Sequence, residues 1–179
     1  MNPPHTHFTP LQRGLHWLMA LAILAMLFIG VGMVSTVSPR YLTLVSIHKP
    51  LGILILILGL IRLAVRLRYG APPLPAAMPE PLKLAAKASH WVFYALMILL
   101  PLIGWGMLSA ANYPVVVLGV QLPAILPPSD SLHAALWAAH KTLALGFFAL
   151  IIIHVAAALM HALIRKDGVF EAMASRRSS

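Results

Sequence analysis

The sequence of 179 residues contains no cysteine. This absence excludes disulfide bonds, iron–sulfur clusters held by cysteine thiolates, and covalently attached c-type haem, which needs a C-x-x-C-H motif. Any metal cofactor must therefore be held by histidine, methionine or carboxylate side chains. Nine histidines remain, which is an unusual number for so apolar a chain.

Charged side chains are also scarce. They make up 9% of the residues, with only four acids, whereas a soluble domain usually carries about a quarter charged residues. The apolar fraction of 60% falls in long uninterrupted runs, which is typical of membrane proteins. Most of the 13 basic residues behind the net charge of +9 flank these runs, a pattern that favours topology signals and anionic lipid headgroups over nucleic acid. We therefore expect membrane lipid, and no nucleic acid, as a partner.

Four apolar runs predict four membrane-spanning helices. They cover about residues 16–38, 45–67, 90–111 and 136–163, and each is long enough to cross ~30 Å of hydrocarbon at 1.5 Å per residue. The first run resembles a signal peptide, but its apolar core is too long and no A-x-A cleavage site follows. The sequence thus predicts a single all-α membrane domain over residues 1–179, built as a four-helix bundle.

The connections and their charges predict the orientation. Residues 39–44 form a short connection. Residues 68–89 are rich in proline, so much of this segment is expected to be an extended linker, and residues 112–135 are long enough to fold back over one membrane face. With four spans, ten basic residues fall on one side and three on the other, which places both termini and the proline-rich linker in the cytoplasm. The ten are Arg13, Arg62, Arg66, Arg68, Lys83, Lys87, Arg165, Lys166, Arg176 and Arg177, and the three are Arg40, Lys49 and Lys141.

Four histidines pair by their predicted depth in the membrane. The interval from His140 to His154 on the fourth run corresponds to about 21 Å and almost four turns of helix, so the two side chains share a face. His48 opens the second run from the outer side, at the depth of His140, and His16 opens the first run from the cytoplasmic side, at the depth of His154. Each pair can bind one haem iron from both sides, with the two haems roughly 20 Å apart. His161, two turns beyond His154 on the same face, is the main rival as inner ligand.

Two arginines of the second run extend this pattern. Arg62 follows His48 by the same number of residues as His154 follows His140. Arg62 therefore shares the helix face of His48 and reaches the depth of the inner haem. Arg66 lies one turn further on. A guanidinium at this depth suits a haem propionate. The alternative is that both side chains snorkel to the lipid headgroups, an interpretation that fits Arg66 better than Arg62.

Two glycines and a fifth histidine complete the candidate cofactor-binding residues. The same interval separates Gly30 from His16 and Gly104 from His90, so both glycines would present bare backbone near the outer haem. Close packing of helices is the other common reason for such glycines. His90, at the inner end of the third run, is a candidate to bond a propionate or a quinone.

Several segments of the chain carry a resemblance to a known family. They are LHWLMA, HKPLGILILILGLIRLAVRLRY followed by PPLP, ASHWVFYALMILLPLIGWGM, YPVVVLG, and AHKTLALGFFALIIIHVAAALMHALIRKDGV. In this order, and over nearly the whole chain, they resemble the bacterial cytochrome b561 family. In that family four helices bind two b haems through histidines at positions that match His16, His48, His140 and His154, and the protein lies in the bacterial inner membrane.

The resemblance also implies an activity. Short stand-alone members resemble an oxidoreductase that takes electrons from superoxide on the periplasmic side and delivers them to ubiquinone. Two irons with bis-histidine ligation leave no position for dioxygen, so outer-sphere electron transfer is the natural chemistry. Lys49, Lys141 and Arg40 are the basic residues of the outer side, and we expect them to steer a small anion towards the outer haem. Equally, these cations could bond propionates or headgroups.

Two other functions remain open at this point. One is a cytochrome b anchor subunit that passes electrons between a peripheral dehydrogenase or hydrogenase and quinone. The other is a non-redox membrane protein for haem handling or transport, although transport usually needs intramembrane acids or broken repeats, neither of which the sequence has. The sequence leaves the formation of a homo-oligomer open.

Overall fold

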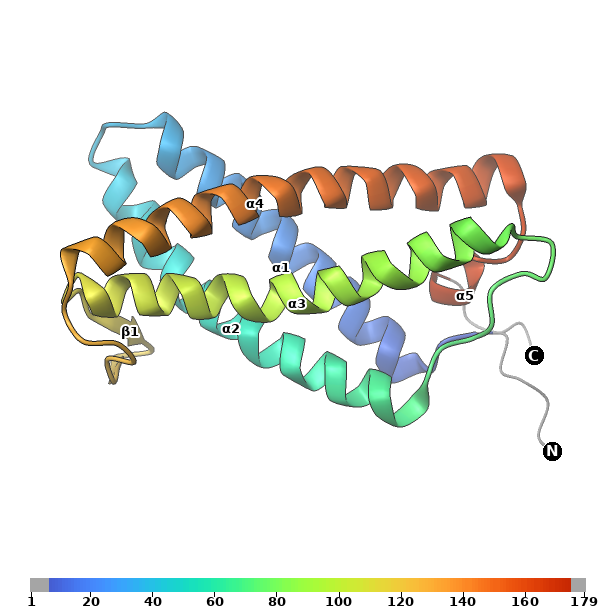
Figure 1. Ribbon diagram of the computed structural model, residues 1–179, viewed down its shortest axis with the longest axis horizontal. Coiled ribbons are helices and arrows are strands. Elements are labelled where there is room, and N and C mark those ends of the chain that lie inside the picture. Colours follow the sequence, from blue (N-terminus) through green and yellow to red (C-terminus); the bar gives the residue numbers. More distant parts are fainter. Residues whose placement is uncertain (1–6, 175–179) are drawn as a thin grey trace.

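The computed structural model describes residues 7–174, and over that range the chain folds into four long helices (Figure 1). The helices are α1 (Pro10–Ser35), α2 (Arg40–Tyr69), α3 (Glu80–Ala110) and α4 (Asp130–Leu159). A π-helical turn, η1 (Met160–Arg165), prolongs α4, and a short helix, α5 (Glu171–Ala174), follows. All four long helices are apolar and long enough to cross a membrane, which confirms the predicted helical membrane bundle. Arg176 and Arg177 lie outside the described residues.

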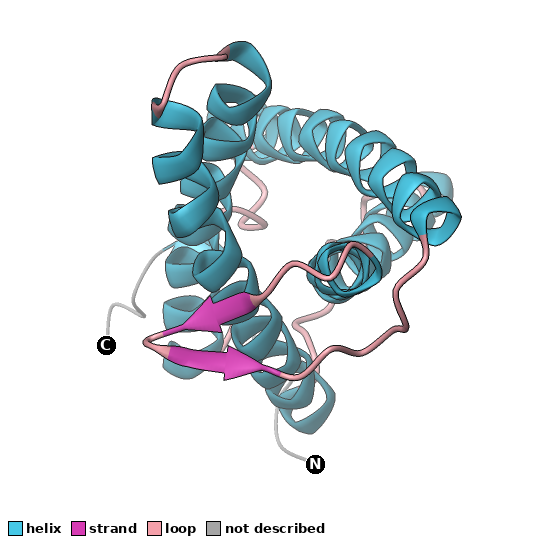
Figure 2. Cartoon of the chain, turned by 90° about the vertical axis from the view of Figure 1, so that its left-hand side faces the viewer, coloured by secondary structure: helices cyan, strands magenta, loops and turns pink. Residues whose placement is uncertain are grey.

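The helices pack in chain order. α1 lies along α2, α2 against α3, and α3 along α4, whereas in the described residues no comparable packing joins α4 back to α1. Figure 2 shows this arrangement in a view from one end of the bundle. The core lies at mid-height and is made by side chains from all four helices, namely Met19, Ile23, Ile55, Met97, Leu100 and Phe147.

The two ends of the described chain lie at the same end of the bundle. The side chain of Thr9 caps α1 by accepting a hydrogen bond from the Gln12 backbone N–H (3.2 Å), and the Gln12 side chain accepts one from the Thr9 backbone N–H (3.0 Å). Gln12 Nε2 also donates to the carbonyl of Gly70, just beyond α2 (2.8 Å). The Phe8 N–H donates to the carbonyl of Ala172 in α5 (3.0 Å). These bonds hold the first and last described elements together.

Much of residues 68–89 was expected to be an extended linker, and the connection in the structure is shorter than that range. α2 continues to Tyr69 and α3 begins at Glu80, so the connection is shortened to residues 70–79. The reason is positional, because Pro79 and Pro81 flank the first residue of α3, where a helix has no need of their missing N–H groups. Pro79 and Pro81 thus lie at the start of a helix, whereas Pro72, Pro73 and Pro75 stay in the connection.

The connection between α3 and α4 contains a β-hairpin. Strand β1 (Val115–Val117) pairs antiparallel with β2 (Val120–Leu122), and Leu118 and Gly119 form the turn with positive φ angles of 50° and 82°. The Ser129 side chain then caps α4, while its N–H donates to the carbonyl of Ala110 at the end of α3 (2.9 Å). The hairpin packs against α2 and α3.

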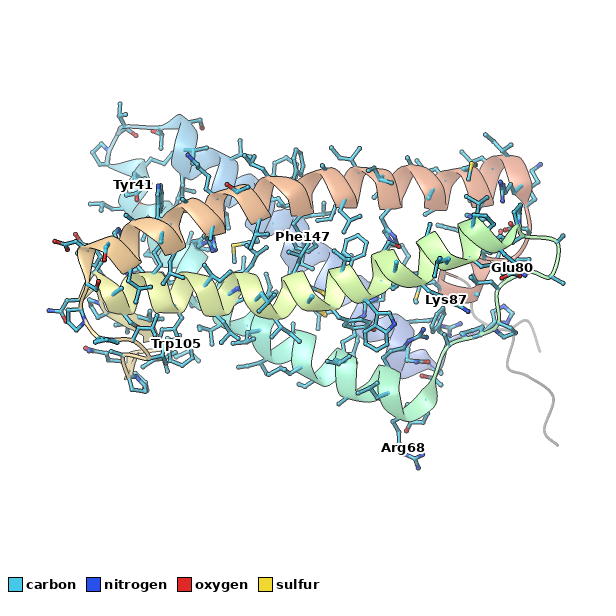
Figure 3. All side chains as sticks on the ribbon, in the orientation of Figure 1. Tyr41, Arg68, Glu80, Lys87, Trp105 and Phe147 are labelled. Atoms are coloured by element: carbon cyan, nitrogen blue, oxygen red, sulfur yellow. The ribbon has the colours of Figure 1, made fainter. Side chains whose placement is uncertain are left out.

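The two ends of the bundle differ in their side chains. Figure 3 shows Arg68, Glu80 and Lys87 towards one end, which we call the inner end, and Tyr41 and Trp105 towards the other, which we call the outer end. The hairpin lies at the outer end and α5 at the inner end (Figure 1). The predicted cytoplasmic location of the inner end stays a prediction.

Candidate functional site

At the outer end, the rings of His48 and His140 face each other. His48 comes from α2 and His140 from α4, and their ring centroids are 6.2 Å apart with an angle of 69° between the planes. His140 Nδ1 lies 3.2 Å from the carbonyl oxygen of Leu100. Because a carbonyl only accepts, Nδ1 carries the proton and Nε2 keeps its lone pair, the state that a metal-binding histidine requires. The Nδ1 atom of His48 is buried and has no hydrogen-bond partner among the described residues.

At the inner end, His154 of α4 has two histidine neighbours. Its ring centroid lies 6.4 Å from that of His16 on α1 and 6.0 Å from that of His90 on α3. The Phe93 ring lies against the same imidazole, with the centroids 5.1 Å apart. The structure therefore brings together the predicted pair of His16 and His154, and it adds His90 as a third imidazole. Ring distance alone does not distinguish His16 from His90.

These ring distances fit one metal atom between two imidazoles. Two rings that ligate one metal from opposite sides have centroids about 6 Å apart, because each metal–nitrogen bond is about 2 Å long and each nitrogen lies about 1 Å from its ring centre. No group of three or more His, Cys, Asp or Glu side chains in residues 7–174 is arranged to hold a bare metal ion. Two imidazoles at this spacing instead suit a metal whose other ligands come from a macrocycle.

Two partly buried arginine side chains lie near the inner pair. Arg62 Nη2 donates to His16 Nδ1 (2.8 Å), and its guanidinium lies 5.7 Å from the centre of the Tyr94 ring. Arg66 Nη1 is buried without a hydrogen-bond partner in the described part of the chain, and its guanidinium lies 5.8 Å from the Phe8 ring centre. Neither arginine forms a salt bridge with a carboxylate in residues 7–174. Two cations without a counter-ion at this depth fit an anionic group such as a haem propionate.

The two candidate glycines have different surroundings. A Cβ atom on Gly104 would lie 3.3 Å from His140 Cε1 and 3.5 Å from His140 Nδ1, so this glycine gives the His140 ring the room that it occupies. A Cβ atom on Gly30 would meet no described atom within 4 Å, so Gly30 faces open space. Gly104 thus leaves space for the ring of His140, a proposed ligand. For Gly30, closeness to a haem stays a prediction.

An apolar layer separates the two pairs. Phe147 lies midway between His140 and His154 on α4, and its buried side chain points into the bundle (Figure 3). It contacts the Phe93 ring, with the centroids 5.8 Å apart, and Phe93 in turn touches His154. This packing places apolar side chains between the outer and inner pairs.

The outer end carries three cations, of which two adjoin histidines of the outer pair in the sequence. Lys49 follows His48 directly, and its Nζ donates to the carbonyl of Pro114 at the base of the hairpin (3.1 Å). Lys141 follows His140 directly, and both Lys141 and Arg40 are exposed. In the described residues, only the carboxylate of Asp130 opposes these three cations at the outer end, which leaves a balance of +3 − 1 = +2.

His161 has a partner of its own. Its Nδ1 lies 2.7 Å and 3.0 Å from the two carboxylate oxygens of Asp167, and both side chains are largely buried. The π-helical turn and the left-handed backbone of Lys166 (φ 48°) bring the chain back so that Asp167 reaches the imidazole. This bond gives His161 a polar role distinct from that of the facing pairs.

Comparison with known proteins decides the family. A family model for prokaryotic cytochrome b561 matches residues 7–176. The chain belongs to the prokaryotic cytochrome b561 family. It is therefore a bacterial membrane protein of electron transfer, and the family implies that it binds haem b.

Three curated relatives align with this cytochrome over nearly their whole length and nearly the whole of this chain. It is 30% identical to the probable superoxide oxidase CybB of Yersinia pestis over 97% of this chain and 98% of the relative. It is 29% identical to cytochrome b561 homolog 1 of Escherichia coli K12 (95% and 98%) and 32% identical to cytochrome b561 homolog 2 of the same strain (92% and 89%). The resemblance seen in the sequence is thus confirmed at the level of the family.

Sequence reasoning missed three features of the site in this cytochrome. The carbonyl of Leu100 bonds His140, the carboxylate of Asp167 bonds His161, and the ring of His90 adjoins His154. The first two depend on how α3 and η1 lie in space, and no residue pattern indicated them. The third follows from helix depth, since His90 was already placed at the inner end of its span.

Proposed function

We propose that this chain holds two haem b groups, one between His48 and His140 and one between His16 and His154, and carries electrons across the bacterial inner membrane. The observation that carries the proposal is the spacing of the two pairs, 6.2 Å and 6.4 Å between ring centroids. A haem b with two histidine ligands exchanges single electrons and has no open position for dioxygen. His16 is preferred to His90 as inner ligand because only His16 matches a ligand position of the family.

The chain's own residues prepare the outer site, whereas the inner site has to rearrange. The Leu100 carbonyl fixes the tautomer of His140, so that Nε2 is free to bind metal. At the inner site, Arg62 donates a hydrogen bond to His16 Nδ1, so this nitrogen carries no proton. A neutral histidine that binds iron through Nε2 needs its proton on Nδ1 instead. With iron bound, Arg62 would have to leave His16, and we propose that Arg62 and Arg66 would then hold the propionates.

We further propose that the electron donor is superoxide at the outer, periplasmic face. One electron leaves each superoxide anion, which becomes dioxygen. The excess of positive charge at Lys49, Lys141 and Arg40 raises the local concentration of a small anion and speeds its encounter with the outer site. The name of the Yersinia pestis relative, probable superoxide oxidase, supports this choice of donor.

The proposed acceptor is ubiquinone at the cytoplasmic side. Two electrons, taken from two superoxide anions, and two protons convert the quinone into a quinol. The His161–Asp167 pair is the candidate proton donor, because an imidazole held by a carboxylate can give up a proton and recover one from the cytoplasm. Its place near the inner end matches a quinone that collects electrons on that side.

The test is quinone reduction by superoxide in purified, haem-loaded protein. Potassium superoxide is added with a short-chain ubiquinone, and we expect one quinol for every two superoxide anions consumed. The rate should fall with rising salt, and Lys49→Ala with Lys141→Ala should lower both the rate and its salt dependence. Lys83→Ala, which removes a cation at the inner end, is the matched control and should leave the rate unchanged.

Two results would contradict parts of this proposal. If superoxide yields no quinol while a chemical reductant still reduces the haem, the donor is wrong. A rate that ignores salt and both lysine substitutions would eliminate the steering role alone.

A further inference from the structure

The hairpin at the outer end has an unusual surface for a segment outside the helices. Residues 111–129, which connect α3 and α4, contain no charged side chain. The hairpin nevertheless exposes large apolar groups, with Leu118 at 98%, Val120 at 64%, Tyr113 at 61% and Val116 at 44% of their full accessible surface. An exposed apolar group of this size, without charges, is not expected to face water.

The hairpin is fixed to the bundle at its base. Val115 is buried, its strand β1 packs against α2 and α3, and the carbonyl of Pro114 accepts a hydrogen bond from Lys49 Nζ (3.1 Å). From this base the strands run across the bundle axis, and the turn at Leu118 and Gly119 reaches the edge of the molecule (Figure 2). The apolar tip therefore projects sideways, in the direction of the surrounding lipid.

Aromatic side chains mark the level of the hairpin. Trp105 Nε1 donates to the carbonyl of Pro123, directly after β2 (3.0 Å), and Trp105 and Tyr41 lie at this outer end in Figure 3. Tyr113 at the base of the hairpin and Tyr41 are both exposed. Tryptophan and tyrosine gather where the hydrocarbon of a membrane meets its headgroups. These aromatic side chains indicate that the hairpin is level with the membrane–water interface at the outer end of the bundle. There it continues the lipid-facing surface of the helices.

We propose that this hairpin, residues 113–122, anchors the outer end of the protein in the periplasmic leaflet of the membrane, with Leu118 and Val120 inserted among the lipids. Lipid is the occupant because the hairpin is uncharged, projects sideways and joins an existing lipid-facing surface. Through Val115 and the Lys49–Pro114 bond, the anchor steadies the part of α2 that carries His48. This inference concerns the chain's contact with lipid and does not depend on the proposed donor or acceptor.

The absence of cysteine makes the test direct, because Leu118→Cys creates the sole thiol of the chain. A nitroxide label on this thiol is studied in the full-length, haem-loaded protein in phospholipid vesicles, with dioxygen and a water-soluble nickel chelate as relaxing agents. Ser38→Cys in the α1–α2 connection of the outer end is the aqueous control, and Phe28→Cys, on a side chain 78% exposed on α1, is the lipid control. None of these positions belongs to the proposed haem sites.

We expect the label at Leu118 to collide severalfold more with dioxygen, relative to the nickel chelate, than the label at Ser38, and so to resemble the label at Phe28. A ratio like that of Ser38 would overturn the proposal by placing the hairpin in water. An immobilised label shielded from both agents would also overturn it. In that case, spin–spin coupling between labelled chains would assign the surface to a second copy of this protein.

Discussion

Replacing Gly104 with valine should displace the ring of His140 and remove the haem of the outer pair. A Cβ atom at this position already lies 3.3 Å from His140 Cε1. Valine adds methyl carbons about 1.5 Å beyond Cβ. Because its side chain has one strongly preferred rotamer in a helix, these methyl groups cannot turn away from the ring freely. The ring must then move by on the order of 1 Å, whereas a metal–ligand distance tolerates only about 0.2 Å.

The assay counts haem per chain by pyridine haemochrome and protein quantification, together with the helical circular dichroism signal. Gly104→Val should bind half as much haem as the unaltered protein and keep its helicity. Gly104→Ala should retain both haems, because the ring then needs to yield by only a few tenths of an ångström. Gly146→Val on α4, where a Cβ meets no described atom within 4 Å, is the matched control and should also retain both. Full haem content in Gly104→Val would refute the placement of His140 as a ligand.

Three further substitutions test other parts of the account. Arg62→Gln should lower the midpoint potential of the inner haem by tens of millivolts, the size expected of one lost charge at an effective dielectric constant of about 20, and a redox titration that finds no change would contradict the role of this cation. Asp167→Asn should slow ubiquinol formation about 10-fold to 100-fold while haem content stays the same, and an unchanged rate would exclude Asp167 from proton delivery. Phe147→Ala should lower the free energy of unfolding by up to about 3–5 kcal/mol, measured by thermal denaturation, whereas Phe148→Ala, at a ring 41% exposed, should have little effect.

The helical repeat explains why so much of the candidate site was predictable. The interval between His140 and His154 is almost four whole turns, so these side chains had to share a face once α4 was assigned as one continuous helix. Depth then followed from the ends of the apolar runs, and the structure brings His48 and His16 to these two imidazoles. The shared face and the depth of these histidines could thus be predicted from periodicity and length, which are properties of a single helix.

What the sequence did not reveal depends on contacts between elements. Residues 115–117 and 120–122 form strands in a hairpin that packs against α2 and α3, a tertiary contact that three consecutive valines do not specify. The prolines before α3 indicated a loop because a proline suits a linker as well as a first helical turn, and only the fold chooses between them. The Asp167–His161 bond requires the π-helical turn, and no hydrophobic periodicity in the sequence predicts that turn.

The number of haem b groups on each purified chain tests the central claim most directly. Pyridine haemochrome measurement with protein quantification should give two per chain, and His48→Ala and His154→Ala should each reduce the number to one by removing a different haem. His90→Ala should keep two, although its ring lies as near to His154 as that of His16. One haem or none in the unaltered protein would contradict the account.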